Sequence, residues 1–86
     1  MKLKKEFITY DTGGESLLVP TGGAGWAGLV KGNKTLGAIL SLLKEDTTEE
    51  AVITAMKARF DASEELIARD VRKVVAELRK IGALDE

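Results

Sequence analysis

The chain contains no cysteine and no histidine among its 86 residues. Without cysteine it can build neither a disulfide framework nor a thiolate metal site. Without histidine it lacks the commonest metal ligand and the commonest general base near neutral pH. No convincing pair of a nucleophile and a base remains. The sequence therefore predicts a protein that is not an enzyme and that uses no metal and no cofactor.

Long apolar runs are also missing. No stretch of about 18 apolar residues exists, so no segment is predicted to span a membrane. The first ten residues carry four charged side chains and no apolar core of the kind that a secretory signal has. We expect one cytoplasmic globular domain over residues 1–86, because 44% of the residues are hydrophobic and 31% are charged.

Positive charge is not in surplus, since the net charge is −1. A dedicated nucleic-acid binder usually shows a basic surplus or a clearly basic patch. The charge balance therefore gives nucleic-acid binding no support, although it does not exclude it.

Glycine and proline are concentrated in the first third of the chain. Seven of the nine glycines and the only proline, Pro20, precede Asn33, whereas the rest of the chain is dense in Leu, Ala, Glu and Lys. Strands followed by helices are the order expected of an α+β domain. Residues 7–10 and 16–19 are β-prone and are separated by a turn, and residues 26–31 form a third candidate strand. We predict a three-stranded antiparallel sheet over about residues 5 to 31.

Three amphipathic helices are predicted after the sheet. The first begins at Asn33 as its N-cap and runs to about residue 44, with its apolar face at every third or fourth position. The second follows a capping box in which the Thr47 hydroxyl caps the first turn, and it ends near Arg59. The third covers about residues 63 to 81 and stops at Gly82. The order of three strands and three helices, together with the short turns between the helices, predicts a winged-helix-like domain for the whole chain. The predicted apolar positions are Leu36, Ile39, Leu40 and Leu43 in the first helix, Val52, Ala55, Met56 and Phe60 in the second, and Ile67, Val71, Val74, Val75, Leu78 and Ile81 in the third.

The spacing of several short motifs resembles the PqqD-like family, the small proteins of pyrroloquinoline quinone biosynthesis and the related recognition elements of peptide-modifying pathways. The motifs are Gly32-Asn33 at the end of the third strand, Gly37-Ala38-Ile39-Leu40 in the first helix, Asp46-Thr47-Thr48-Glu49-Glu50 before the second, Ala58-Arg59-Phe60-Asp61 with Glu64-Glu65 and Asp70-Val71 around the start of the third, and Leu78 with Gly82-Ala83-Leu84 at the close. The chain departs from the family at two places. Other members often have aromatic residues at the positions that correspond to residues 26–30, and they commonly have tryptophan where this chain has Leu40.

The resemblance implies a non-catalytic peptide-binding module. Members of the family bind the leader of a ribosomal precursor peptide as an added strand and present it to a modifying enzyme, often a radical S-adenosylmethionine (SAM) enzyme. Here the leader would pair with the third strand beside the third helix. A proline at Val30 would weaken that pairing if the Val30 amide faces the open edge. The peptide-binding residues that this predicts are Trp26, Gly28, Leu29, Val30, Lys31, Arg69, Asp70, Lys73 and Lys80.

Two other interpretations remain open. A winged-helix DNA-binding regulator has the same order of elements, and the third helix carries five basic residues, but four acidic residues partly offset them. A plain interaction domain for a folded partner is the other alternative. Trp26 also fits packing in the core as well as an aromatic contact at the edge of the sheet.

Overall fold

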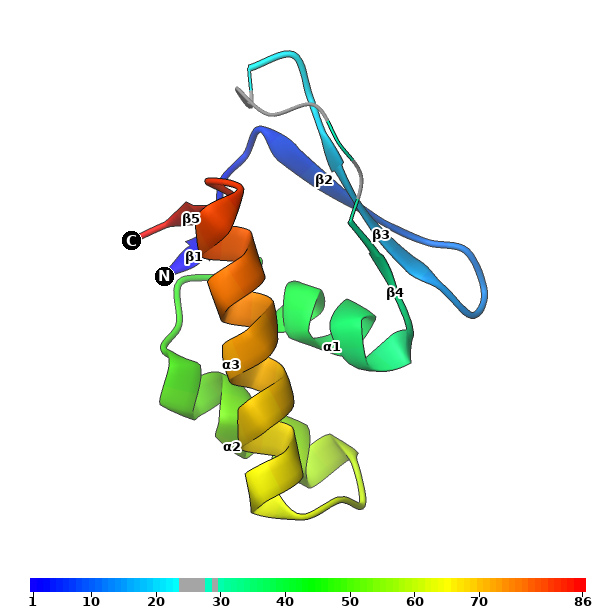
Figure 1. Cartoon of the computed structure of the whole chain (residues 1–86), viewed down its shortest axis with the longest axis vertical. Coiled ribbons are helices and arrows are strands. Elements are labelled where there is room, and N and C mark those ends of the chain that lie inside the picture. Colours follow the sequence, from blue (N-terminus) through cyan, green and yellow to red (C-terminus); the bar gives the residue numbers. More distant parts are fainter. Residues whose placement is uncertain (24–27, 29) are drawn as a thin grey trace.

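Strands come first and helices follow in the computed structural model, which describes residues 1–23, 28 and 30–86 (Figure 1). A short last strand, β5, is the exception to that order. The elements are β1 (Lys2–Leu3), β2 (Phe7–Asp11), β3 (Ser16–Pro20), β4 (Val30–Gly32), α1 (Lys34–Leu42), α2 (Glu49–Arg59), α3 (Glu64–Lys80) and β5 (Leu84–Asp85). The predicted α+β class, a winged-helix-like arrangement of a three-stranded antiparallel sheet followed by three helices, is confirmed.

The main sheet has the order β2-β3-β4, and both pairs are antiparallel. A tight turn joins β2 to β3, with Gly13 at a φ of 83°, a conformation that side chains disfavour. The Asp11 side chain accepts a hydrogen bond from the Gly13 amide (3.1 Å), and the Thr12 amide donates to the Glu15 carbonyl (2.9 Å). These bonds fix the register, in which Leu18 lies opposite both Thr9 and Val30. Of the predicted third strand, residues 26, 27 and 29 lie outside the described part of the chain.

A second, two-stranded sheet joins the two ends of the chain, and the sequence did not predict it. Lys2 pairs with Asp85 and Leu3 with Leu84. The Leu3 amide also donates to the Leu43 carbonyl (2.8 Å), which ties this sheet to the end of α1. Strands of two residues are too short to show an alternating pattern in the sequence, so only tertiary pairing reveals them.

The helix caps agree with the sequence at one of three starts. Asn33 caps α1, as predicted, by accepting from the amides of Thr35 and Leu36, whereas Ser63, which was not predicted as a cap, caps α3. At α2 the prediction is wrong by one residue, because Thr48 and not Thr47 is the cap. The Thr47 amide instead donates to the Met1 carbonyl (2.8 Å), so this residue belongs to the connection with the first strand.

Gly82 ends α3 with a φ of 74°, as predicted. Within the described residues, no helix is long and apolar enough to cross a membrane.

The core lies where α1 meets the sheet and the other two helices. All four predicted apolar positions of α1 are buried, and Leu18 of β3 is fully enclosed above them. On α2 the buried set differs from the prediction, because Ile53 is buried while Ala55 and Phe60 are only half-buried. On α3, Val74 and Ile81 are likewise half-buried. Side chains at the border of an apolar stripe are exposed or covered according to the neighbouring element, which periodicity alone does not reveal.

Candidate functional site

The β4 strand forms one edge of the main sheet, and its pairing defines which backbone groups face outward. In an antiparallel pair, residues that exchange two hydrogen bonds alternate with residues that exchange none. The bonds from Thr12 to Glu15 (2.9 Å) and from Thr21 to Glu6 (2.7 Å) flank the β2–β3 ladder and set this alternation. It follows that Leu17 of β3 bonds to β2, whereas the backbone of Leu18 faces β4.

Lys31 is therefore the described residue of β4 whose amide and carbonyl point away from the sheet. Leu18 lies opposite Val30 and Leu17 opposite Lys31, so Val30 bonds to β3 and Lys31 does not. No backbone partner for Lys31 occurs among the described residues. A proline at Val30 was expected to weaken leader binding only if the Val30 amide faces the open edge. The Val30 amide instead faces β3, so this substitution does not test the open edge. The position at which proline removes an outward donor is Lys31.

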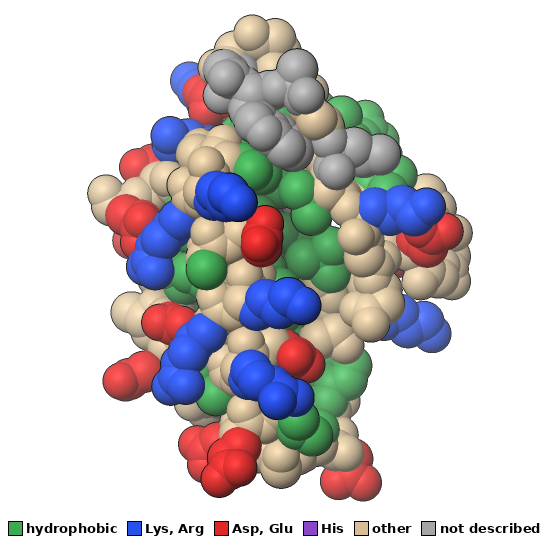
Figure 2. Space-filling model, in the orientation of Figure 1, with side chains coloured by type: hydrophobic (Ala, Val, Ile, Leu, Met, Phe, Trp, Pro, Cys, Tyr) green, Lys and Arg blue, Asp and Glu red, His purple; other side chains and the backbone are tan. Residues whose placement is uncertain are grey.

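A groove of about 300 Å³ runs between this edge and α3. In Figure 2 it is the hollow where hydrophobic side chains show between the charged side chains of α3 and the strand β4. From the sheet side it is bordered by Val30, Lys31 and Gly32. From α3 it is bordered by Asp70, Lys73, Val74, Glu77 and Leu78, which recur every three or four residues and so occupy one face of the helix.

The floor of the groove belongs to the core. Leu78 is 1% exposed and Leu36 is 8% exposed, while Val30 and Val74 are half-buried above them. Gly32 comes so close to Leu36 that an added Cβ would stand 2.5 Å from the Leu36 Cδ2 atom. A floor of packed aliphatic side chains holds its shape, so an apolar side chain entering from the solvent meets a preformed surface.

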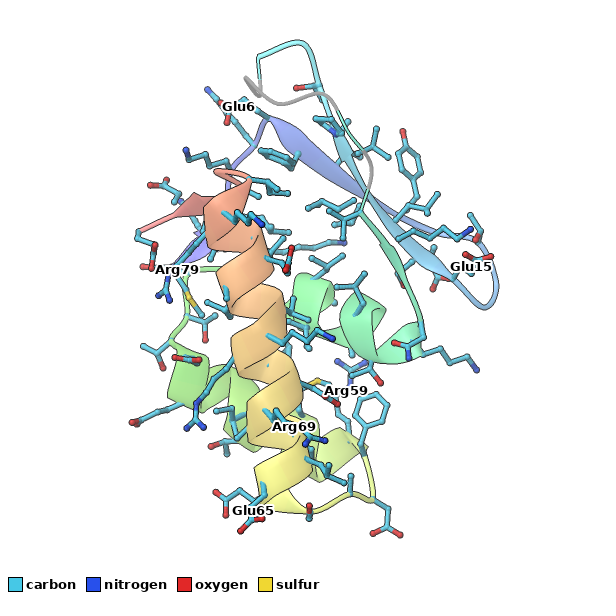
Figure 3. All side chains as sticks on the ribbon, in the orientation of Figure 1. Glu6, Glu15, Arg59, Glu65, Arg69 and Arg79 are labelled. Atoms are coloured by element: carbon cyan, nitrogen blue, oxygen red, sulfur yellow. The ribbon has the colours of Figure 1, made fainter. Side chains whose placement is uncertain are left out.

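The rim carries charges of both signs. Asp70, Lys73 and Glu77 are exposed along α3. The Lys31 ammonium lies 3.3 Å from a carboxylate oxygen of Glu15, at the turn between β2 and β3 (Figure 3). The rim thus offers hydrogen-bond and ion-pair partners without a strong preference for one sign of charge.

Two cations of α3 are paired elsewhere. The Arg79 guanidinium contacts the Glu86 carboxylate at 2.7 Å, beside the β1–β5 sheet (Figure 3), and Arg72 lies 3.9 Å from Glu49. The hydrogen bond from Arg79 holds the pKa of the Glu86 carboxyl below its usual 4.5 and raises the pKa of Arg79. These pairs lower the positive charge that α3 presents to a partner.

The structure brings four of the nine predicted site residues to this groove, namely Val30, Lys31, Asp70 and Lys73. Arg69 and Lys80 are exposed on α3 outside its lining, and so is Gly28 ahead of β4. Trp26 and Leu29 lie outside the described residues.

Sequence reasoning missed other lining residues, Val74, Glu77, Leu78 and Leu36 among them. The helical spacing from Asp70 would have found Glu77, since residues seven apart share a face. Among the described residues, no group of three acidic side chains is placed to hold a metal ion.

Comparison with known proteins yields a family match and a structural match. The family model for coenzyme PQQ synthesis protein D (PqqD) matches residues 17–84. The solved structure titled "TbiB1 in Complex with the TbiA(beta) Leader Peptide" superposes with a TM-score of 0.79 at 20% sequence identity, covering 99% of this chain and 95% of that chain. No curated protein sequence matches this chain.

Proposed function

Because the chain belongs to the family of coenzyme PQQ synthesis protein D, we propose that its 86 residues form one non-catalytic domain that captures the leader of a precursor peptide. The observation that carries the proposal is the open β4 edge beside a groove with an apolar floor. Strand addition uses both features, since the backbone edge provides hydrogen bonds and the groove selects alternate side chains. The similar fold of TbiB1, whose structure was solved with a leader peptide, supports the same assignment.

In this proposal the leader lies along β4, with backbone bonds to Lys31. Every second side chain of the leader then points toward α3 and enters the groove over Leu36 and Leu78. Lys73 and the acidic groups of the rim set the register through exposed ion pairs, each contributing up to about 1 kcal/mol. Apolar burial and strand pairing therefore provide most of the affinity, and binding should persist at moderate salt.

The modifying enzyme is the second partner that we propose, and family resemblance favours a radical SAM enzyme of the kind found in pyrroloquinoline quinone biosynthesis. The domain has one edge of its sheet to hold the leader and other surfaces to contact an enzyme. A leader held on the sheet of a domain that also contacts the enzyme would have a raised local concentration at the enzyme, as any tethered substrate does.

The DNA-binding alternative has less support. A recognition helix presents several free cations to the groove of DNA. On α3, Arg72 and Arg79 are paired with carboxylates, and Asp70 and Glu77 stand beside Lys73. A DNA phosphate approaching this face would meet two carboxylates at close range.

The test is a titration of isotopically labelled protein with synthetic N-terminal segments of the short polypeptides encoded next to its gene. We expect amide shift changes at Lys31, Gly32 and Val74, with those of α2 unchanged. Lys31→Pro should weaken binding about tenfold, because one outward donor is lost and the ring obstructs pairing.

Lys31→Ala is the matched control, because it removes the same side chain but keeps the amide. It should change the affinity less than about threefold, the effect of one exposed charge. Equal losses in the two variants would show that the side chain and not the strand edge binds the peptide. Shift changes confined to α2 would contradict the site itself.

A further inference from the structure

The opposite edge of the main sheet, along β2, is also open. By the alternation described above, Tyr10 and Ile8 bond to β3, whereas the amides and carbonyls of Thr9 and Asp11 point outward. Neither Thr9 nor Asp11 has a further backbone partner among the described residues. An unpaired edge of this kind is a template for another strand unless side chains block it.

A groove of about 460 Å³ lies along this edge, between β2, α1 and the end of α2. It is separate from the groove beside β4, since the two share no lining residue. Its α1 wall contains Gly37, Ala38 and Ser41. Small side chains at these positions leave room for a chain to approach the helix closely. Gly37 also packs closely against β3, where an added Cβ would meet the Ser16 hydroxyl.

The charge of this groove is mostly positive. Lys34, Lys44 and Arg59 line it and are exposed, and Arg59 reaches it from the end of α2 (Figure 3). None of the three forms an ion pair within the described part of the chain. Asp11 is the one acidic residue in the lining, and its side chain already accepts the Gly13 amide (3.1 Å). Half-buried Phe60 adds an apolar contact beside Arg59.

We propose that the groove beside β2 binds an acidic, extended segment of a second polypeptide, independently of the leader. Lys34 begins α1 and Lys44 lies two residues beyond its end at Leu42, so the length of this nine-residue helix, about 13 Å at about 1.5 Å per residue, separates the two cations. About five extended residues span that length. The segment therefore carries acidic residues at both ends of a five-residue stretch, on the same face of the strand. The backbone edge of Thr9 and Asp11 distinguishes a polypeptide from a nucleic acid, which has no strand to add.

The experiment uses the whole chain and three probes. The first is a capped nine-residue peptide, Gly-Ser-Glu-Val-Thr-Val-Glu-Ser-Gly, the second has Gln in place of both Glu residues, and the third is a short single-stranded oligonucleotide. We expect the Glu peptide to bind about three- to tenfold more tightly than the Gln peptide, and this advantage to shrink between about 20 mM and about 300 mM NaCl. Amide shift changes should fall on Thr9, Asp11 and Ser41.

Variants separate the two edges. Thr9→Pro should weaken the Glu peptide about tenfold, while Lys31→Pro, on the opposite edge, should leave its binding unchanged. Lys34→Glu should weaken the Glu peptide about threefold or more through repulsion. Asp11→Asn should strengthen it about two- to fivefold, because the amide oxygen can still accept the Gly13 bond while the repelling charge is gone. Asp11→Asn keeps the proposal testable if Thr9→Pro does not fold.

Several results would overturn the proposal. They are equal binding of the Glu and Gln peptides, an equal loss in Thr9→Pro and Lys31→Pro, and an oligonucleotide that binds as tightly as the Glu peptide and is insensitive to Thr9→Pro. Because the leader is absent from all of these titrations, their failure would leave the assignment of the β4 groove untouched.

Discussion

The two edges of the sheet have the same backbone chemistry but different walls. Beside β4 the groove is floored by Leu36 and Leu78, and its rim is mixed in charge. Beside β2 the groove is floored by the small residues of α1, and its rim is mostly basic. One edge is therefore suited to apolar side chains and the other to acidic ones. An open strand becomes specific through the helix that packs next to it.

The largest expected effect tests whether the β4 groove is part of the core. Leu78→Ala should lower the free energy of unfolding by about 2–5 kcal/mol, because it leaves a cavity under a fully buried position. Phe60→Ala, beside the β2 groove, should cost less than about 2 kcal/mol, since Phe60 is only half-buried. Urea denaturation of both variants measures the difference. Similar losses would mean that the two grooves are supported alike.

Substituting alanine for Gly32 or Gly37, the two close-packed glycines, should lower the free energy of unfolding by an intermediate amount. Gly32→Ala should cost about 2–3 kcal/mol, because its Cβ would meet Leu36 at the Cβ atom (2.9 Å), near the root of that side chain. Gly37→Ala should cost less, because the clashing Ser16 hydroxyl can rotate and alanine favours the helix. Thermal unfolding monitored by circular dichroism measures both.

Peptide affinities measured for the same two glycine variants distinguish the two edges further. Displaced Leu36 should enter the β4 groove, so Gly32→Ala should weaken the leader and not the acidic peptide, with the reverse in Gly37→Ala. Gly14→Ala is a suitable control, since nothing lies within 4 Å of an added Cβ there. A loss of both ligands in either variant would show that the edges are coupled.

The smallest effect concerns the pair that ties the end of α3 to β5. The pKa of Glu86 is lower in the folded chain than its usual 4.5, because Arg79 donates a hydrogen bond to it. The stabilisation is therefore present above that value and is lost as the pH falls through the folded pKa. In Glu86→Gln, Tm should be slightly reduced near neutral pH, and its difference from the unchanged chain should shrink as the pH is lowered below 4.5 and the carboxylate is protonated.

Hydrogen exchange in Glu86→Gln would locate this effect. Only the last turn of α3, next to the β4 groove, should lose protection, while α1 beside the β2 groove keeps it. A difference in Tm that persists at low pH would contradict the role of the carboxylate.

Local chemistry in the sequence was sufficient for most elements. The turn ahead of Ser16, the cap Asn33 and the stop at Gly82 were predicted, because each depends on a few neighbouring residues. The position of the Thr48 cap was missed, because the contact of Thr47 with Met1 is remote in sequence.

The site was predictable only in part. Val30, Lys31, Asp70 and Lys73 were placed together through family resemblance, whereas Arg69 and Lys80 were included because they are charged residues on the same helix. Charge does not tell which side of a helix faces a groove; the helical spacing from Asp70 to Glu77 does.

The sequence by itself determined the three strands of the main sheet and the three helices, because turn residues, caps and apolar periodicity act over a few positions. Only the tertiary structure decided which backbone groups are open. Register sets Lys31, Thr9 and Asp11 outward and Val30 inward, and a shift of one residue would reverse every one of them. The tertiary packing of α3 and α1 likewise decided that one open edge has an apolar floor and the other a basic rim.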